Sequence, residues 1–240
     1  MPKDLARWGS QTAKGGFKNE RRVANEFNNW EISVLAQSWL RIMGYTISDV
    51  KQVVAYRPRG TGHKTDVIVR VAKSDKSIHR HKISCKKGHG NQIDKRPVDK
   101  YVKAFNLSQA TTKALKKFVG EHGYTPIELL RRGEIAQGKY GQLKDERRMI
   151  FKELEPSEQK AILREFTEKQ DCILKFILQG VDNMAVDWFI RDNDLEPIQT
   201  TLERAAIGGV IPTRTGFKIG QIKVQRKGGT PDPRSLQFKW

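Results

Sequence analysis

The sequence is poor in cysteine and has no long apolar run. Its 240 residues include two cysteines, Cys85 and Cys172. Structural zinc sites usually take four clustered ligands, and small disulfide-stapled domains are rich in cysteine. Both cysteines fall in apolar segments, so we expect reduced, packed thiols and neither a disulfide nor a zinc site. No stretch of about 18 apolar residues is present, so we expect no membrane-spanning helix.

Acidic residues are too few to balance the basic ones. Lysine and arginine number 45 against 27 aspartate and glutamate residues, which leaves a net charge of +18. Such a surplus repels itself unless a negatively charged partner binds it. Nucleic acid, an anionic membrane and an acidic protein all satisfy this condition. Basic pairs recur along the whole chain, which favours a folded domain that follows phosphate groups over a disordered basic tail.

Hydropathy patterns predict the order of helices and strands. Apolar residues recur at helical spacing from Asn19 to Met43, and Gly44 is a natural stop. Three strands follow. From Lys95 to about Asp192 the hydropathy pattern is typical of helices, with two long stretches at Pro156–Gln170 and Cys172–Gln179. Two further strands close the sequence. The five predicted strands are Val50–Tyr56, Thr65–Val71, His81–Lys86, Lys218–Gln225 and Leu236–Trp240.

This order predicts an α/β fold in which helices flank a mixed central β-sheet. We expect a helical middle segment and a C-terminal β-hairpin closed by a glycine-rich loop over residues 228–233. No composition break marks a second domain, so residues 1–240 are interpreted as one domain. Within it we place a core at about 1–100, the helical segment at about 100–192 and the hairpin at about 210–240.

One pair of predicted strands carries residues suited to phosphodiester hydrolysis. Asp66 opens the second strand, and Ser84-Cys85-Lys86 lies on the third. Side chains alternate along a strand, so Ser84 and Lys86 share one face while Cys85 points to the core. Carboxylate and carbonyl oxygens are ligands for Mg²⁺, and a nearby lysine can orient or deprotonate water, or neutralise charge.

These residues predict a metal site that uses Asp66, Ser84 and the carbonyl of Cys85, with Lys86 beside the attacking water. Serine supplies a neutral oxygen, so a further carboxylate is needed, and Glu20 on the first helix is the candidate. We expect Mg²⁺, with Mn²⁺ able to replace it. An alternative register would put Lys82 in the lysine position, but Arg80 would then occupy the ligand position, and a cation cannot bind magnesium.

Several motifs resemble small type II restriction endonucleases of the PD-(D/E)XK superfamily, specifically the subgroup that cuts the palindrome GCGC. They span nearly the whole chain: Gly9-Ser10-Gln11-Thr12-Ala13-Lys14, Gly16-Phe17-Lys18-Asn19-Glu20, Asn91-Gln92-Ile93-Asp94-Lys95, Arg147-Arg148-Met149, Gln225-Arg226-Lys227-Gly228-Gly229 and Leu236-Gln237-Phe238-Lys239. The sequence departs from the subgroup at Ser84, where the subgroup has glutamine, and the loop before Asn91 looks shorter here.

The resemblance implies a Mg²⁺-dependent site-specific endonuclease for double-stranded DNA, with a DNA methyltransferase as its genetic partner. It implies a monomer or weak homodimer. Residues Met1 to Lys14 lack the apolar core of a signal peptide, so we expect the protein in the cytoplasm, here of a prokaryotic cell. The resemblance also suggests DNA contacts from the loop at Asn91–Lys95 and the hairpin at Gln225–Lys239, with Arg226, Lys227 and Gln237 as base readers; asparagine, glutamine, arginine and lysine can indeed bond base edges. The DNA-binding candidates are Asn91, Gln92, Lys95, Gln225, Arg226, Lys227, Gln237 and Lys239.

Two other functions remain open from the sequence. Serine at position 84 favours a non-catalytic DNA-binding protein that keeps a degenerate nuclease fold. A structure-specific repair nuclease would use the same residues and ignore the base sequence. Cleavage of plasmid DNA into discrete fragments, a smear or nothing would distinguish the three.

Overall fold

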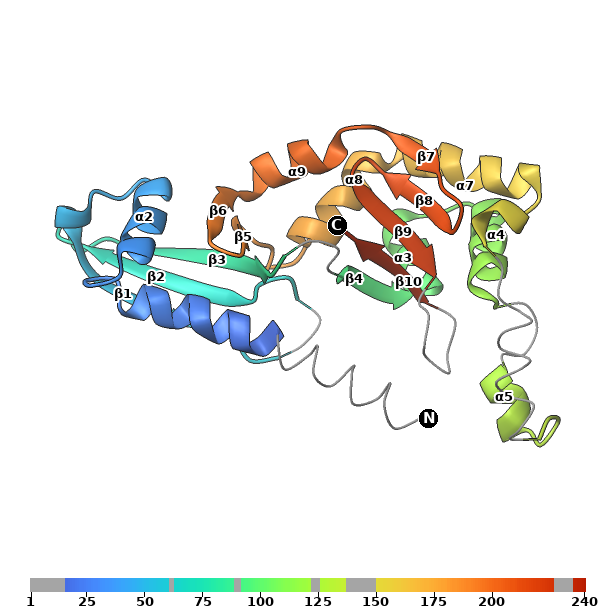
Figure 1. Cartoon of the computed structure of the whole chain (residues 1–240), viewed down its shortest axis with the longest axis horizontal. Helices are drawn as coiled ribbons and strands as arrows, with labels where there is room; N and C mark the ends of the chain where they lie inside the picture. Colours follow the sequence, from blue (N-terminus) through green and yellow to red (C-terminus); the bar gives the residue numbers. More distant parts are fainter. Residues whose placement is uncertain (1–15, 61–62, 89–91, 122–125, 137–149, 227–234) are drawn as a thin grey trace. The chain divides into compact units, whose positions relative to one another are not determined.

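A computed structural model describes residues 16–60, 63–88, 92–121, 126–136, 150–226 and 235–240 (Figure 1). Contacts divide the chain into two compact units. The first unit comprises Met1–Asn91 and Leu178–Glu203, and the second comprises Gln92–Ile177 and Arg204–Trp240. Each unit contains one five-stranded sheet. The expectation of a single endonuclease domain, with the three sections given above, stays a prediction.

The first unit begins with two helices where the sequence pattern predicted one. A helix over residues 16–28 ends in a turn, and α2 (Val34–Ile42) then starts at Ser33, whose side chain accepts a hydrogen bond from the Ala36 N–H. At the end of the first helix, Asn28 bonds both the N–H and the C=O of Ala55 in the neighbouring strand. The prediction of one helix from Asn19 to Met43 is therefore wrong, because a serine cap restarts the helix.

The first sheet has the strand order β1-β2-β3-β5-β6. β3 and β5 run parallel and the other pairs are antiparallel, so the sheet is mixed, as predicted. The predicted strand at Val50–Tyr56 is confirmed without change, whereas β2 lies two residues later than expected and β3 begins three residues earlier. The bounds are β1 Val50–Tyr56, β2 Val67–Lys73, β3 Ile78–Lys86, β5 Trp188–Arg191 and β6 Asp194–Pro197.

A core of apolar side chains joins the first helix, α2 and this sheet. Val23 and Phe27 from the helix and Trp39 from α2 are buried against the valines of β2. Full burial of each such side chain stabilises the fold by about 1.5–3 kcal/mol. Cys85 belongs to this core, but Cys172 is exposed, so the expectation of two packed thiols is wrong for Cys172; both cysteines are free.

The second sheet has the strand order β4-β10-β9-β8-β7 and is antiparallel throughout. The second half of its first strand, β4, lies where the pattern from Lys95 onward predicted helix. β5 of the first sheet also lies inside that predicted helical stretch, so the stretch is interrupted at both ends. The bounds are β4 Gln92–Pro97, β7 Val210–Pro212, β8 Gly216–Ile219, β9 Ile222–Arg226 and β10 Ser235–Lys239.

The predicted strand Lys218–Gln225 is two strands, β8 and β9, joined by a tight turn. Gly220 has a positive φ of 55°. A Cβ there would collide with the carbonyl oxygen of Ala205. Alternation of polar and apolar residues continues through the turn, so hydropathy alone could not locate it. The loop predicted at residues 228–233 lies outside the described residues.

Helices accompany the second sheet, in agreement with the predicted helical middle segment. Aromatic rings of α3, α7 and the sheet form its core; Tyr101 contacts Phe238 at 5.1 Å between ring centroids, and Phe166 contacts Phe217 at 5.0 Å. No helix among the described residues is long and apolar enough to cross a bilayer. The helices are α3 Val98–Phe105, α4 Gln109–Val119, α5 Pro126–Arg131, α7 Pro156–Glu168, α8 Gln170–Leu174, a π-helix at Lys175–Gln179, and α9 Ile198–Ala206.

Candidate active site

The first sheet holds Asp66 in place at the point where β2 begins. The N–H of Asp66 donates to the carbonyl of Ile83 at 2.9 Å, and the β2–β3 ladder then starts at the pair Val67–Ile83. The side chain of Asp66 therefore lies beside the end of β3, whose last residues have no β2 partner. About a fifth of this side chain (21%) is exposed.

Three donors from the end of β3 converge on one oxygen of Asp66. The Ser84 hydroxyl donates to Oδ2 at 3.1 Å, the Cys85 N–H at 2.7 Å and the Lys86 ammonium at 3.3 Å. Ser84 and Lys86 thus lie on the same side of β3, and the structure brings together the three side chains that the strand pattern pointed to. Their catalytic roles stay predictions.

The carbonyl of Cys85 faces the same space. In a β-strand the N–H and C=O of one residue point to the same side. Because the Cys85 N–H points to Asp66, its carbonyl lies at that edge too, beyond the start of β2. The Cys85 side chain is only 6% exposed, and burial raises the pKa of its thiol well above the ordinary value. Cys85 can therefore supply a carbonyl oxygen here, whereas its thiol stays protonated.

Lys86 is charged at the site. Burial alone would lower the pKa of Lys86, but the negative charge of Asp66 and the hydrogen bond to it hold the pKa above its ordinary value. A protonated lysine donates hydrogen bonds and neutralises negative charge. A lysine in this state can neutralise negative charge but cannot accept a proton.

Glu20 contributes a second carboxylate to the same electrostatic environment. Its Oε2 accepts a hydrogen bond from Arg57 Nε at 2.7 Å. Burial and the negative charge of Asp66 raise the pKa of Glu20, against the opposing influence of Arg57 and Lys86. The sequence analysis missed Arg57, because its partner lies 37 residues earlier and no periodic pattern links them.

These oxygen donors fit a hard divalent cation. Burial is the main cause of the raised pKa of Glu20, and the negative charge of Asp66 adds to it; a cation between two carboxylates offsets both effects. Ser84 and the Cys85 carbonyl add neutral oxygens of the kind that Mg²⁺ accepts. Among the described residues no group of three histidine, cysteine or acidic side chains could hold a metal alone, so such a site depends on these neutral oxygens.

The alternative lysine, Lys82, does not reach Asp66. Its ammonium donates to the carbonyl of Asn183 at 3.3 Å, and Lys82 lies opposite Ile68 in the β2–β3 ladder. Arg80, which would take the ligand position, is exposed and lies opposite Arg70. The structure therefore favours Lys86.

A basic pocket of about 530 Å³ lies in the same unit, next to residues of the site in sequence. Arg22 organises it with three hydrogen bonds, to the Asp192 carbonyl at 2.6 Å, the Asn193 side chain at 3.0 Å and the Asn19 side chain at 3.3 Å. The sequence analysis did not identify this pocket, because Asp192 and Asn193 come from the β5–β6 turn. Its lining residues are Lys18, Asn19, Arg22, Lys87, Asp192 and Asn193.

Most of the predicted DNA contacts lie on one face of the second sheet. Gln237 of β10 is paired with Gln225 of β9 and with Lys95 of β4, and Lys239 of β10 is paired with Gln92 of β4. The opposite face carries buried apolar residues such as Phe238 and Val224. Arg226 ends β9 opposite Leu236. Asn91 and Lys227 lie outside the described residues.

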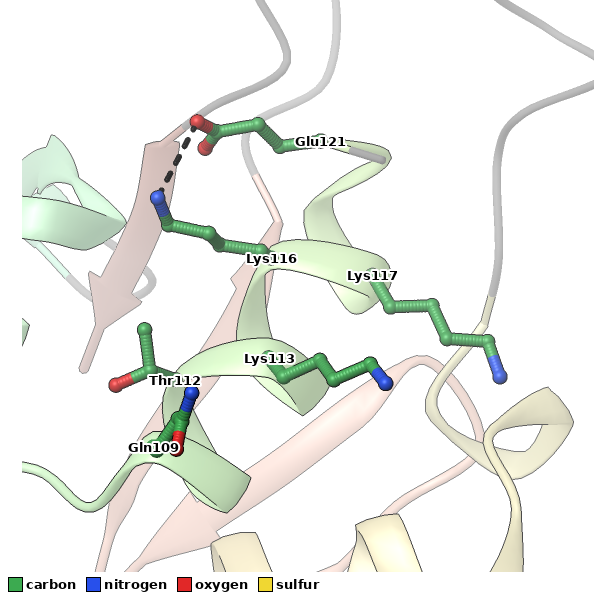
Figure 2. A pocket seen from close by; sticks show the side chains of 6 residues that line it. All are labelled: Gln109, Thr112, Lys113, Lys116, Lys117 and Glu121. Atoms are coloured by element: carbon green, nitrogen blue, oxygen red, sulfur yellow. Dashed lines mark ion pairs between the residues drawn. The ribbon is translucent and has the colours of Figure 1, made fainter. Parts of the chain in front are cut away.

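A second pocket, on α4, has no such chemistry (Figure 2). It has a volume of about 490 Å³ and is lined by Gln109, Thr112, Lys113, Lys116, Lys117 and Glu121. Figure 2 shows Lys116 turned toward Glu121 and Lys117 turned away from it. Lys116 also pairs with Asp99, and Lys117 with Glu158, so ion pairs engage two of the three lysines. One carboxylate among three lysines does not make a divalent cation site.

Comparisons with known proteins agree with the resemblance seen in the motifs. The model of the R.HinP1I restriction endonuclease family matches residues 43–239. A solved structure of the restriction endonuclease MspI in complex with its cognate DNA is similar in fold, with a TM-score of 0.58 and 13% identity, over 85% of this chain and 76% of that chain. No curated protein sequence is similar enough to count as a relative.

The structural likeness confirms the predicted α/β fold of the restriction endonuclease type. The family match is evidence for function as well as fold, because it spans most of the chain. The matched region includes Asp66, Ser84, Lys86 and both strands of the C-terminal hairpin. The protein therefore belongs to the R.HinP1I restriction endonuclease family and is a type II site-specific deoxyribonuclease.

Proposed function

We propose that the enzyme hydrolyses phosphodiester bonds in double-stranded DNA at a short G/C-containing palindrome of the GCGC type, and that it requires Mg²⁺. The observation that carries this proposal is the convergence of Ser84, the Cys85 N–H and Lys86 on Asp66, beside the carboxylate of Glu20. Mn²⁺, which has similar ligand preferences, should support the same reaction.

Four groups are proposed to hold the cation: the carboxylates of Asp66 and Glu20, the Ser84 hydroxyl and the Cys85 carbonyl. A bound Mg²⁺ supplies charge neutralisation and activation of water at the phosphate. The remaining work falls to this chain's side chains. Arg57 holds the Glu20 carboxylate in position through its 2.7 Å hydrogen bond. The Cys85 N–H fixes Asp66 Oδ2 and so orients its carboxylate.

Lys86 is proposed to neutralise the negative charge that develops on the phosphate oxygens. Its ammonium is protonated and lies 3.3 Å from Asp66 Oδ2. A short movement of this side chain, which is 22% exposed, would bring it to a phosphate oxygen or to a water beside it. A preorganised cation of this kind is worth several kcal/mol when charge develops in a water-poor site.

The polar face of the second sheet is proposed to contact DNA. Gln92, Lys95, Gln225, Gln237 and Lys239 share this face. Arg226, the last residue of β9, is paired with Leu236 and so alternates onto the opposite face; it is proposed as a contact from the sequence motif. Asn91 and Lys227 are proposed as contacts from the sequence motifs alone. The MspI structure similar to this chain holds its cognate DNA, which supports DNA as the partner. Lysine and arginine are suited to the O6 and N7 of guanine, and a glutamine amide can donate to these acceptors or accept from the N4 group of cytosine.

The cellular setting is proposed from the same family. A restriction endonuclease needs a cognate DNA methyltransferase to protect the host's own sites, and we propose this genetic partner here. We also propose that the protein acts as a monomer or weak homodimer in the prokaryotic cytoplasm. A monomer would cut the two strands of a palindrome in successive events.

Plasmid cleavage tests the proposal. The protein is incubated with supercoiled plasmid and Mg²⁺, Mn²⁺ or EDTA, and the ends of the fragments are sequenced. We expect discrete fragments with either metal, none with EDTA, and a G/C palindrome at every end. A smear would indicate a structure-specific nuclease, and binding without cutting would indicate a degenerate nuclease fold; either result would overturn the proposal.

A further inference from the structure

Three glutamines from three adjacent strands form a row of hydrogen-bonded amides on the second sheet. Gln225 of β9 donates from Nε2 to Oε1 of Gln237 on β10 at 3.4 Å. Gln237 in turn donates from its Nε2 to Oε1 of Gln92 on β4 at 2.8 Å. The three residues lie up to 145 positions apart in sequence, so the strand order β4-β10-β9 brings them together.

Gln237, in the middle of the row, is not available as a free base-reading group. It is 6% exposed, and both ends of its amide are engaged, the oxygen by Gln225 and the nitrogen by Gln92. Gln92 is exposed and Gln225 half-buried. The outer glutamines can therefore meet a ligand, whereas the central one contacts them.

The direction of these two bonds gives the outer amides opposite polarity. An amide has one carbonyl oxygen and one NH₂ group, and these differ only in hydrogen bonding. Because the oxygen of Gln92 accepts from Gln237, its NH₂ group is the one directed to a ligand. Because the NH₂ group of Gln225 donates to Gln237, its oxygen is the complementary acceptor. Guanine presents the acceptors N7 and O6 in the major groove, and cytosine presents an N4 donor.

We propose that Gln237 is a positioning residue that holds Gln92 as a hydrogen-bond donor toward guanine and Gln225 as an acceptor toward cytosine. The proposal rests on the proposed function of this face as the DNA contact. It also revises the role expected for Gln237 from the sequence, which was direct base reading. In the β4–β10 ladder Lys95 lies opposite Gln237, and Lys239 lies opposite Gln92. Two lysines therefore flank the row, where they could contact the phosphates of DNA.

The substitution Gln237→Glu tests the polarity. A carboxylate accepts but does not donate, so Gln225 keeps its bond, while Gln92 must turn its amide by 180° to donate to position 237. Gln92 then directs its oxygen outward. We expect the discrimination against a changed base pair, measured as a ratio of kcat/KM values, to fall about tenfold at the position that Gln92 contacts and to stay unchanged elsewhere.

The substitution Gln237→Met removes both bonds and should relax discrimination at the positions of both outer glutamines. These positions are identified with Gln92→Met and Gln225→Met on plasmid sites that differ from the cognate site by one base pair. If Gln237 acts through Gln92, the double variant Gln92→Met/Gln237→Glu should discriminate like Gln92→Met alone. Gln199→Met, an exposed glutamine of α9, is the matched control.

Two failures can be told apart. If the wild-type protein gives no discrete fragments, the proposed function fails. If the wild type cuts discretely but Gln237→Met and Gln237→Glu keep its discrimination at every base pair, Gln237 does not position the readers and the inference fails. A uniform loss of cutting at all sites, with unchanged ratios, would indicate a purely structural role and would also overturn it. Since Gln92 is exposed, Gln92→Met supplies the reference even if a Gln237 variant folds poorly.

Discussion

Two carboxylates, one in each unit, accept hydrogen bonds from the same three kinds of donor. Asp66 accepts from a serine hydroxyl, a backbone N–H and a lysine ammonium. Glu165 on α7 does the same, from the hydroxyl of Ser108 at 2.8 Å, its N–H at 2.9 Å and Lys169 at 3.0 Å. Hydrogen-bond partners alone therefore do not identify a catalytic carboxylate in this protein.

The surroundings of the two carboxylates differ. Lys169 also donates to the carbonyls of Phe105 and Asn106, at 2.8 and 2.7 Å, so its ammonium closes the end of α3. The Glu165 side chain is 9% exposed against 21% for Asp66. Burial alone would raise the pKa of Glu165, but hydrogen bonds from Thr111, Lys169 and Ser108 lower it to about 2. This carboxylate is saturated, and its role is to hold α3, α4 and α7 together.

Asp66, in contrast, lies near a second carboxylate and a carbonyl oxygen. Burial, and after it the negative charge of Asp66, raises the pKa of Glu20, so the two carboxylates interact electrostatically. The two carboxylates have equally many kinds of hydrogen-bond donor. What distinguishes the candidate active site from the structural ion pair is the second negative charge close to Asp66. Four substitutions test how the two units differ, from the largest expected effect to the smallest.

Asp66→Asn should reduce the cleavage rate at least about 100-fold while binding to the specific DNA site is retained. Asparagine keeps the shape and one oxygen but removes the charge that a cation needs. Cleavage of plasmid and a gel-shift assay on a duplex with the site give the two readouts. Asp49→Asn, at an exposed residue of the same unit, is the control. Full activity of Asp66→Asn would place the chemistry elsewhere.

Lys86→Met should reduce the rate about 100-fold, and Lys86→Arg should restore part of it. Methionine has a similar length without charge, whereas arginine keeps the charge in a different geometry. Single-turnover cleavage measures both variants, with Lys51→Met on the exposed side of β1 as the control. Equal rates for Lys86→Met and the wild type would show that the Lys86–Asp66 ion pair is only structural, like the pair of Lys169 with Glu165.

Arg226→Ala, in the second unit, should change the choice of site more than the rate of cutting. We expect a loss of discrimination worth about 1–3 kcal/mol between the cognate site and sites with one changed base pair. Competition between two plasmid sites in one tube measures this ratio directly. Unchanged ratios would show that Arg226 does not read bases.

Glu165→Gln should lower the free energy of unfolding by about 1–2 kcal/mol at neutral pH and leave cleavage unchanged under conditions where the protein stays folded. The folded-state pKa of Glu165 is depressed, so its contribution is present above the unfolded-state value of about 4.5 and is lost as the pH falls toward 2. Urea unfolding at several pH values should therefore show a gap between variant and wild type that closes in acid. A gap independent of pH would contradict this origin.

The fold class and the grouping of Asp66, Ser84 and Lys86 could be predicted from the sequence, whereas the bounds of several helices and strands could not. Period-two alternation on two neighbouring strands was sufficient to group Asp66, Ser84 and Lys86, because both strands adjoin in sequence. The same kind of pattern failed at Gly220, where alternation runs on through a turn, and at residues 29–33, where two helices bury their apolar sides against one sheet.

Contacts between distant segments could not be predicted. The amide row depends on the register of β10 against β4, strands that begin more than 140 residues apart. Arg57 meets Glu20 only because β1 ends near the first helix. The buried, structural role of Glu165 could not be predicted either, because a glutamate on an amphipathic helix ordinarily faces solvent.

The parallel pairing of β3 with β5 has a consequence for how the enzyme is made. The β5–β6 region anchors the N-terminal part of the first unit: Asn193 accepts a hydrogen bond from Trp39, and Met184 accepts one from Thr65, next to Asp66. A ribosome adds about 5–20 residues per second, so β3 waits roughly 5–20 seconds for the partner strand that follows about 100 residues later. Until β5 is made, β3 lacks this neighbour and the side chains of Trp39 and Thr65 lack these acceptors, so the sheet that carries Asp66 and Lys86 is completed only late in synthesis.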